Sequence, residues 1–415
     1  MNKHLHDQVN AIVSAAIAAV LPDAAVIRAL EQAEFPGRIF LVAAGKAAWQ
    51  MAKAAHDVLG SRIHSGIVIS KYDHIKGPIG NLCCYEAGHP IPDDNSYLAT
   101  QAALDLTANL TETDTVLFLL SGGGSALFEK PLVSGEELQD ITAQLLASGA
   151  DITEINTIRK RLSAVKGGRF AQHCAPARVF SIVLSDIIGD PLDMIASGPA
   201  YPDSSTCAQA VAIAEKYALR LSAEALDLLN QETPKQLSNV TTQITGSVRQ
   251  LCAAAASAAE GLGYETHLLT DQLCCQARDA GSFLGTMAKT HSGASRKLAF
   301  LAGGETVVKL TGTGKGGRNQ ELALSAAAMI DGLKHVCIFS VGSDGTDGPT
   351  DAAGGYVDGN TAKALRSQGI DLYAVLQNND AYHALKNTDG LIITGPTGTN
   401  VNDFAMVLIN PDATI

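Results

Sequence analysis

Short apolar runs rich in β-branched residues alternate along this chain with alanine-rich stretches of helical periodicity, and this alternation restricts the fold more than any other feature. Parallel strands need long crossover connections, which are usually helical. The pattern therefore predicts an α/β fold, with a mostly parallel sheet that helices cover on both faces. Nine strands are predicted, at residues 39–44, 66–70, 115–120, 179–184, 265–269, 298–302, 336–341, 391–394 and 404–409.

Composition and charge narrow the class of protein. Hydrophobic residues make up 46% of the 415 residues and charged residues only 17%, so the chain is expected to fold into two or three domains. Its formal net charge of -12 argues against nucleic acid or an anionic membrane as a partner. No run reaches the ~18 apolar residues of a membrane span. The apolar run at 11–21 has the spacing of an amphipathic helix rather than of a signal peptide.

Glycine and cysteine usage point to an enzyme of the cytoplasm. The 39 glycines beside only 5% aromatic residues indicate many tight turns and places where the backbone can approach a ligand, which is typical of α/β enzymes. The eight cysteines include two adjacent pairs and no C-x-x-C motif. They are interpreted as reduced core thiols, which predicts a cytoplasmic location.

A domain boundary is predicted near residue 238. Residues 231–245 are polar, contain proline and form the least structured stretch of the sequence, and a helix that begins near Gly246 starts a new series of strands and helices. The predicted domains are therefore 1–238 and 239–415. In open α/β sheets ligands bind at the carboxyl ends of strands, so candidate site residues are sought where the predicted strands end.

The first such strand runs into Gly45-Lys46 and a helical stretch. A lysine at this place would add to the attraction that helical N–H groups exert on a phosphate or carboxylate, although an ordinary surface lysine is the alternative. The strand at 115–120 runs into a glycine-rich turn, whose amides could converge on phosphate oxygens, or which could be only a tight turn. The turn consists of Ser121, Gly122, Gly123, Gly124 and Ser125. It matches neither G-x-G-x-x-G, because Leu127 takes the place of the third glycine, nor a Walker A loop.

Basic and acidic residues follow in the same half of the chain. Arg159 and Lys166 would share one face of a helix and could bind an acidic substrate, or form a solvated basic surface. Asp186 and Asp190 come just after the strand at 179–184. They could hold Mg²⁺ or accept a proton from a substrate hydroxyl, and aspartates that only form turns are the alternative.

The second half repeats this design. Glu305 follows a strand, and a second glycine-rich segment leads to Lys315, Arg318 and Asn319 at the head of a predicted helix. Gly314-Lys315 lacks the other residues of a Walker A motif. The acid-rich loop at 341–351 does not fit an EF-hand, so it could bind a metal in another way or simply turn. A strand followed by small polar residues recurs at 395–403.

Taken in order, these segments resemble the class II glycerate kinases, the glycerate 2-kinase family whose C-terminal half is called the MOFRL domain. A departure is Asp73, where glycine is commoner before the histidine, and it affects only the local turn. The similarity covers nearly the whole chain, in the segments 43–46, 71–74, 88–90, 121–126, 160–169, 185–191, 197–199, 303–306, 317–321, 343–348 and 398–403.

The resemblance implies ATP-dependent phosphorylation of D-glycerate at its 2-hydroxyl, which gives 2-phospho-D-glycerate and ADP. It also implies a Rossmann-like N-terminal domain with a mostly parallel sheet, a smaller α/β MOFRL domain, and an active site in the cleft between them. ATP, Mg²⁺ and D-glycerate are the expected ligands, and a homodimer is one option for the assembly. The resemblance makes Lys46 and Arg318 the catalytic pair, one from each domain. The full set of predicted roles is catalysis by Lys46, Arg318 and Asp190; nucleotide binding by residues 121–125, Glu305 and Asn319; substrate binding by Arg159, Lys166 and His89; and metal binding by Asp186 and Asp190.

Two other functions compete with this interpretation. An NAD(P)-dependent hydroxypyruvate reductase should carry G-x-G-x-x-G with an acidic residue about 20 positions later, and no segment supplies both. A non-enzymatic α/β module that binds small anions would not need charged residues at so many strand ends. Phosphoryl transfer does use such groups, because it depends on positive charge around the transferred group and a clamp on the phosphates.

Overall fold

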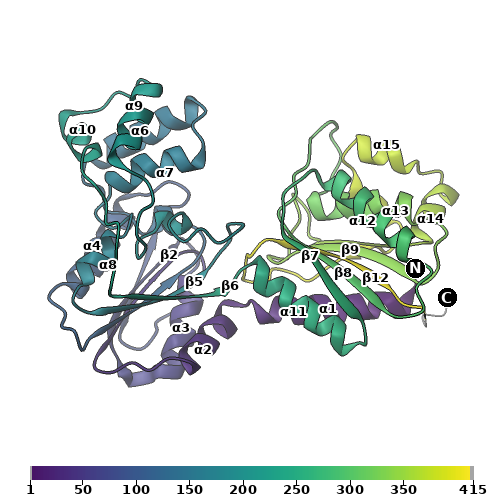
Figure 1. Cartoon of the computed structure of the whole chain (residues 1–415), viewed down its shortest axis with the longest axis horizontal. Coiled ribbons are helices and arrows are strands. Elements are labelled where there is room, and N and C mark those ends of the chain that lie inside the picture. Colours follow the sequence, from purple (N-terminus) through teal and green to yellow (C-terminus); the bar gives the residue numbers. More distant parts are fainter. Residues whose placement is uncertain (1, 412–415) are drawn as a thin grey trace. The chain divides into compact units, whose positions relative to one another are not determined.

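The computed structural model describes residues 2–411, which divide into two compact units (Figure 1). We call residues Pro22–Ser185 and Asp190–Thr245 the N-terminal unit. The C-terminal unit comprises Met1–Leu21, Asp186–Gly189 and Gly246–Ile415. Each unit contains one six-stranded sheet with helices on both of its faces, as the alternation in the sequence predicts.

The sheet of the N-terminal unit has the strand order β3-β2-β1-β4-β5-β6, and its pairings from β3 through β5 are parallel. This is the order of the Rossmann fold, in which the chain changes direction across the sheet between β1 and β4. Strands β1 and β4 are buried along their whole length, because helices cover them on both sides. The strands are β1 Ile39–Ala44, β2 Ile63–Lys71, β3 Leu82–Ala87, β4 Thr115–Leu120, β5 Arg178–Leu184 and β6 Val240–Gly246.

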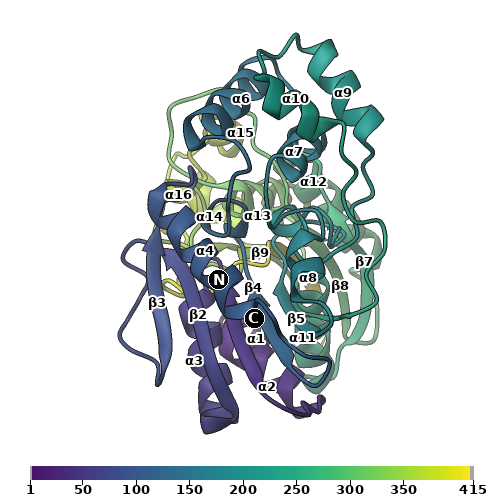
Figure 2. The same ribbon diagram turned by 90° about the vertical axis from the view of Figure 1, so that its left-hand side faces the viewer.

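Helices α2 and α3 pack on one face of this sheet, against the side chains of Leu41, Leu117 and Ile182. Helices α4 and α8 lie on the other face, where Phe118 contacts Phe170 of α8 (Figure 2). A separate hydrophobic cluster joins α6, α7, α9 and α10. The helices of this unit are α2 Pro22–Glu31, α3 Ala48–Leu59, η1 Gly60–Arg62, α4 Asp94–Thr107, α5 Gly124–Leu127, α6 Gly135–Ala147, α7 Ile152–Arg161, α8 Arg169–Cys174, η2 Ile195–Ser197, α9 Cys207–Lys216 and α10 Ala223–Leu229.

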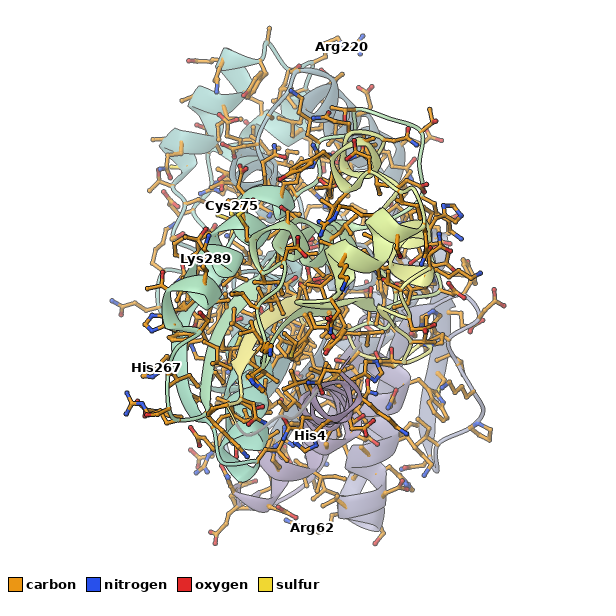
Figure 3. All side chains as sticks on the ribbon, turned by 90° about the vertical axis from the view of Figure 1, so that its right-hand side faces the viewer. His4, Arg62, Arg220, His267, Cys275 and Lys289 are labelled. Carbon is orange, nitrogen blue, oxygen red and sulfur yellow. The ribbon has the colours of Figure 1, made fainter. Side chains whose placement is uncertain are left out.

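The sheet of the C-terminal unit is mixed rather than mostly parallel. Its order is β11-β10-β9-β12-β8-β7, in which only the pairing of β7 with β8 is parallel. Strand β7 is an edge strand with exposed side chains, among them His267 (Figure 3). The strands are β7 Glu265–Leu273, β8 Leu298–Gly304, β9 Val336–Gly342, β10 Gly354–Asp358, β11 Leu391–Ile392 and β12 Asp403–Ile409.

Two groups of helices enclose this second sheet. Helices α1 and α11 cover one face and share its hydrophobic cluster, whereas α12 to α16 cover the other (Figure 1). The helices are α1 Lys3–Ala19, α11 Val248–Gly261, α12 Ala277–His291, α13 Arg318–Met329, α14 Thr361–Ser367, α15 Leu372–Gln377 and α16 Ala381–Lys386.

This division of the chain differs from a simple boundary near residue 238. Helix α1 is amphipathic as predicted, but its apolar face, with Leu5, Val9 and Ile12, is buried against α11 in the C-terminal unit. Strand β6 lies within 231–245, the stretch predicted to be least structured, and completes the first sheet. The chain crosses between the units at Leu21 and Pro22, briefly around residues 186–189, and at Thr245 and Gly246.

Two further expectations concern cysteines and membranes. All eight cysteines are free, but only Cys174, Cys252 and Cys337 are buried, and Cys275 lies exposed on the surface (Figure 3). Among residues 2–411, no single helix is long and apolar enough to cross a membrane. Helices α1 and α2 reach that length and apolarity only when they are taken together.

Candidate active site

The first part of the site lies where β1 and β4 end, at the switch point of the Rossmann-like sheet. The amide of Lys46 donates to the carbonyl of Gly122 over 2.9 Å, and the amide of Ala47 donates to Ser121 Oγ over 3.1 Å. Gly45 permits this contact, because a Cβ at its φ of +127° would lie only 2.2 Å from Ser121 Oγ. These bonds hold the two loops against each other. The Ser121 hydroxyl is occupied by the bond from Ala47.

Lys46, Gly123 and His89 come together above this junction. A Cβ built on Gly123 would lie 3.3 Å from Lys46 Cγ and 3.0 Å from His89 Cδ2, so the three loops after β1, β3 and β4 are in contact. The side chain of Lys46 is exposed. Gly122, Gly123 and Gly124 carry no side chains, so none stands between Lys46 and the backbone of their loop. The sequence predicted all three residues as parts of the site, and the structure places them side by side.

Two basic residues that were not predicted individually, Lys71 and His74, extend this group. His74 Nδ1 lies 3.0 Å from the carbonyl oxygen of Lys46, and Lys71 ends strand β2. Burial, together with the charges of Lys46, Lys71 and His74, lowers the pKa of His89. His89 is thus held in its neutral form in an electropositive environment suited to an anion. The signal in the sequence was the segment 71–74, which carries a lysine and a histidine directly after a strand.

Arg159 and Lys166 approach the glycine-rich loop from inside the protein. The prediction that they share one helix is wrong, because α7 ends at Arg161 and Lys166 lies in the following turn. Both nevertheless donate to the carbonyl of Ser125, Arg159 Nη2 over 3.1 Å and Lys166 Nζ over 2.9 Å. Lys166 is fully buried and also bonds Phe128, so its ammonium supports the loop instead of reaching outward to a substrate. Arg159 keeps 15% of its side chain exposed.

The predicted pair of aspartates is divided between the units. Asp186 belongs to the C-terminal unit and Asp190 to the N-terminal unit. Asp190 has a positive φ of 50°, and its Oδ1 is buried without a hydrogen-bond partner. Within residues 2–411, no group of three or more His, Cys, Asp or Glu side chains is placed to hold a metal ion by itself.

A separate candidate group, in the C-terminal unit, surrounds Arg318, the first residue of α13. Its guanidinium donates to Asp403 over 2.5 and 3.1 Å and to Glu305 Oε1 over 2.7 Å. Burial alone would lower the pKa of Arg318, but the bonds and charges of Asp403 and Glu305 raise it. A two-point bond of this kind fixes the direction of the guanidinium. Asp403, which the sequence did not single out, is therefore the residue that orients Arg318.

Asp347 fixes the backbone at the start of the same helix. Its carboxylate accepts from the amides of Asn319 and Gln320 over 3.1 and 2.9 Å. Burial raises the pKa of Asp347 to about 6, although these two amides oppose the shift. Asn319 is buried, and its side chain bonds Ser340 and Asp347, so its amide is used within the protein. The acid-rich loop at 341–351 thus contributes a helix cap.

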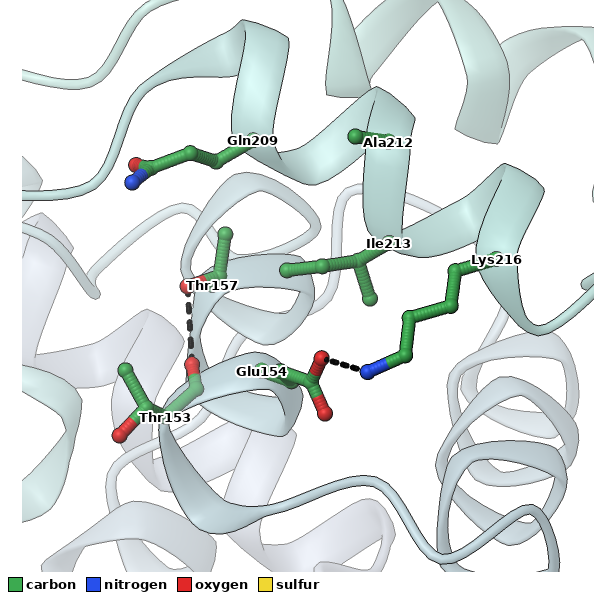
Figure 4. Close-up of a pocket in the computed structure, with 7 residues that line it drawn as sticks. All are labelled: Thr153, Glu154, Thr157, Gln209, Ala212, Ile213 and Lys216. Carbon is green, nitrogen blue, oxygen red and sulfur yellow. Dashed lines mark hydrogen bonds and ion pairs between the residues drawn. The ribbon is translucent and has the colours of Figure 1, made fainter.

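A pocket of about 330 Å³ lies elsewhere, between α7 and α9 (Figure 4). Its lining includes Glu154 and Lys216, which form an ion pair with each other at 2.6 Å. None of the residues predicted for the site lines it. Because its two charges neutralise each other, this pocket offers little to a charged substrate.

Comparison with known proteins identifies the family. Residues 8–230 match a domain of unknown function, DUF4147, and residues 298–403 match the MOFRL family. The D-glycerate 2-kinase of Thermotoga maritima is 54% identical over 96% of this chain and 97% of its own length. The chain belongs to the glycerate 2-kinase family. The glycerate 2-kinase of Pyrococcus horikoshii is 42% identical over 91% of this chain and 88% of its own length.

Solved structures agree with this family assignment. A crystal structure of glycerate kinase from Thermotoga maritima has a TM-score of 0.95 and 53% sequence identity, and covers 98% of this chain and all of that one. A structure of a Pyrococcus horikoshii protein has a TM-score of 0.93 at 39% identity, with 98% of both chains covered. Two relatives from Agrobacterium vitis, 39% and 37% identical, carry the name of hydroxypyruvate reductases instead. The expected resemblance to the glycerate 2-kinases, including the MOFRL domain, is confirmed.

Proposed function

We propose that this protein is a glycerate 2-kinase, which transfers the γ-phosphoryl group of ATP to the 2-hydroxyl of D-glycerate and forms 2-phospho-D-glycerate and ADP. The observation that carries the proposal is the exposed Lys46 beside the glycine-rich loop at the switch point between β1 and β4. A lysine in this place can bind phosphate oxygens and stabilise the negative charge that shifts between them during phosphoryl transfer. The names of the relatives at 54% and 42% identity support the same reaction.

The proposed roles are assigned to residues of each unit in turn. Lys46 and the turn at 121–125 bind the ATP phosphates from the N-terminal unit, and Arg318 acts on the transferred phosphoryl group from the C-terminal unit. Glu305 and Asp403 hold Arg318 in its direction.

D-glycerate needs a cationic side chain that binds its carboxylate and a proton acceptor for its hydroxyl. Arg159 and Lys46 are the proposed carboxylate partners, and Arg159 Nε is buried without a hydrogen-bond partner of its own. His89, neutral beside Lys46, can bond a hydroxyl of the substrate. During transfer, an oxygen–phosphorus bond forms at the 2-hydroxyl as the bond to the β-phosphate breaks, and the hydroxyl proton passes to a carboxylate, for which we propose Asp190.

Mg²⁺ fits this site as the partner of the nucleotide. Asp190 Oδ1 is a buried carboxylate oxygen that lacks a protein partner, which suits a metal ligand or a proton acceptor. One or two carboxylates are sufficient, because Mg²⁺ takes its other ligands from phosphates and water. Bound with ATP, the ion would neutralise charge on the phosphates, and Asp186 and Asp190 are the residues proposed to hold it.

The cofactor that the reaction requires distinguishes a kinase from a reductase. We expect D-glycerate consumption to require ATP and Mg²⁺, to stop on addition of EDTA and to return with excess Mg²⁺, while NADH and NADPH change nothing. The measurement is ADP release by the purified protein, with the oxidation of NADH in the presence of hydroxypyruvate followed in parallel. NADH oxidation that depends on hydroxypyruvate would favour the reductase.

The proposal includes a cytoplasmic location, with small molecules rather than nucleic acid or a membrane as partners and a homodimer as one option for the assembly. It is supported by the net charge of -12 and by eight free cysteines.

A further inference from the structure

A pair of fully buried charges lies directly beneath the glycine-rich loop. Lys166 Nζ is 2.8 Å from Glu129 Oε2, and neither side chain is exposed to solvent. Arg159 lies 3.6 Å from the same oxygen. Burial lowers the pKa of Lys166 to about 8, and Glu129 opposes this shift. Such a pair is costly to bury, so it needs a reason besides stability to be retained.

Lys166 and Arg159 donate their hydrogen bonds to carbonyls at the end of one short helix, α5. Lys166 donates to the carbonyls of Ser125 and Phe128 over 2.9 and 3.1 Å, and Arg159 donates to the Ser125 carbonyl as well. Helix α5 has only four residues, Gly124–Leu127, so its last carbonyls have no partner within the helix. The two cations supply those partners and fix the end of the helix that continues the glycine-rich loop.

The other side of Ser125 rests on a strained turn. Ser125 Oγ lies 3.2 Å from Ser197 Oγ, which donates to Asn156 Oδ1 over 2.8 Å. Ala196 and Ser197 both have positive φ angles, 51° and 62°, although they are not glycine. Conformations of this kind are strained and persist where the surrounding structure enforces them. A Cβ on Gly124 would lie 2.8 Å from Ala196 Cβ, so the turn and the loop are in direct contact.

We propose that Ser125 is positioned from beneath by Lys166 with its partner Glu129 and from the side by Ser197, and that these residues hold the glycine-rich loop ready for the nucleotide phosphates. None of the three touches a substrate. The role of the loop in this statement rests on the proposed function. Lys166, which the sequence suggested as a substrate ligand, thus becomes a positioning residue, and Glu129 is added to the functional set.

The main test replaces both buried charges at once. The double variant Lys166→Met with Glu129→Met removes the bonds of Lys166 to Ser125 and Phe128, and it takes away both members of the buried pair, so neither is left without the other. Arg159 loses the carboxylate 3.6 Å away, but it is partly exposed and keeps its bond to the Ser125 carbonyl. We expect a folded protein whose KM for ATP rises about tenfold or more and by a larger factor than its KM for D-glycerate, because the loop is displaced while Arg159 stays bonded to Ser125. Arg38→Met is the matched control: it breaks the Arg38–Asp114 pair in the same unit and should change neither KM.

Hydrogen exchange of the backbone amides at 122–128 provides a readout that does not depend on activity. Exchange there should become faster in the double variant and not in Arg38→Met. Unchanged exchange and an unchanged KM for ATP in a folded double variant would overturn the positioning role, whereas a wild-type protein without kinase activity but with the expected exchange would contradict only the proposed function. If the double variant does not fold, Ser197→Ala, which removes the lateral bond to Ser125 together with the bond to Asn156 Oδ1, must raise the KM for ATP or the exchange rate for the proposal to stand.

Discussion

Replacing Lys46 with alanine is expected to lower kcat by at least about two orders of magnitude, because a charge aimed at the transferred phosphoryl group in a closed site is worth several kcal/mol. The fold should be retained, since the bond from Lys46 to Gly122 is made by the main chain and the lysine side chain is exposed. Steady-state kinetics with saturating ATP and D-glycerate, together with a melting curve, provide the measurement.

Lys53→Ala is a suitable control for this variant. Lys53 lies on α3, the helix that begins two residues after Lys46, and its partly exposed side chain pairs with Asp57. Its replacement should leave kcat nearly unchanged, because exposed pairs of this kind contribute little. A folded Lys46→Ala protein with the turnover of the control would remove Lys46 from the catalytic group and leave it a structural residue.

Arg318→Ala is expected to lower kcat much more than it raises the KM for ATP, since a charge that meets the phosphoryl group in the closed site acts mainly in the transition state. It should also lower the free energy of unfolding, because Asp403 is buried and loses its partner. Breaking a buried pair costs about 3–5 kcal/mol, and we expect less here because a third of the Arg318 side chain is exposed.

These two effects of Arg318→Ala can be separated with Arg278→Ala. Arg278 pairs with the buried Glu321 at 3.0 Å in the same unit, and its side chain has a similar exposure. That variant should lose stability with little change in kcat. An Arg318→Ala protein whose kcat falls no further than that of Arg278→Ala would show that Arg318 acts only on stability.

Buried strands were the part of the fold that could be predicted most closely. The predicted limits of β1 and β4 are those of the structure, because each is an uninterrupted apolar run that ends at small or polar residues. Strands β3 and β6 were missed, since edge strands are half exposed and lack an apolar run. Strand β10 begins with Gly354 and Gly355, which are unfavourable in strands and concealed it.

The candidate site was predictable where its residues follow predicted strands of one sheet. Lys46 and Gly123 each follow a predicted strand of the same sheet, so the rule for strand ends brings them together, whereas His89 follows β3, which was missed, and was expected through the resemblance. Asp403 lies 85 residues from Arg318, and no local pattern connects an arginine at a helix start with an aspartate of a distant strand. The inward direction of Lys166 depends on Glu129, a tertiary contact that spacing along the chain does not reveal.

The position of the phosphoryl group on the product tests the central proposal most directly. Purified protein is incubated with D-glycerate, ATP and Mg²⁺, and the product is examined by proton-coupled phosphorus NMR. A phosphate on the 2-oxygen couples to the single proton of its carbon and gives a doublet, which is the predicted result. A triplet from a phosphate on the 3-oxygen, or no phosphorylated glycerate at all, would contradict the assignment of this protein as a glycerate 2-kinase.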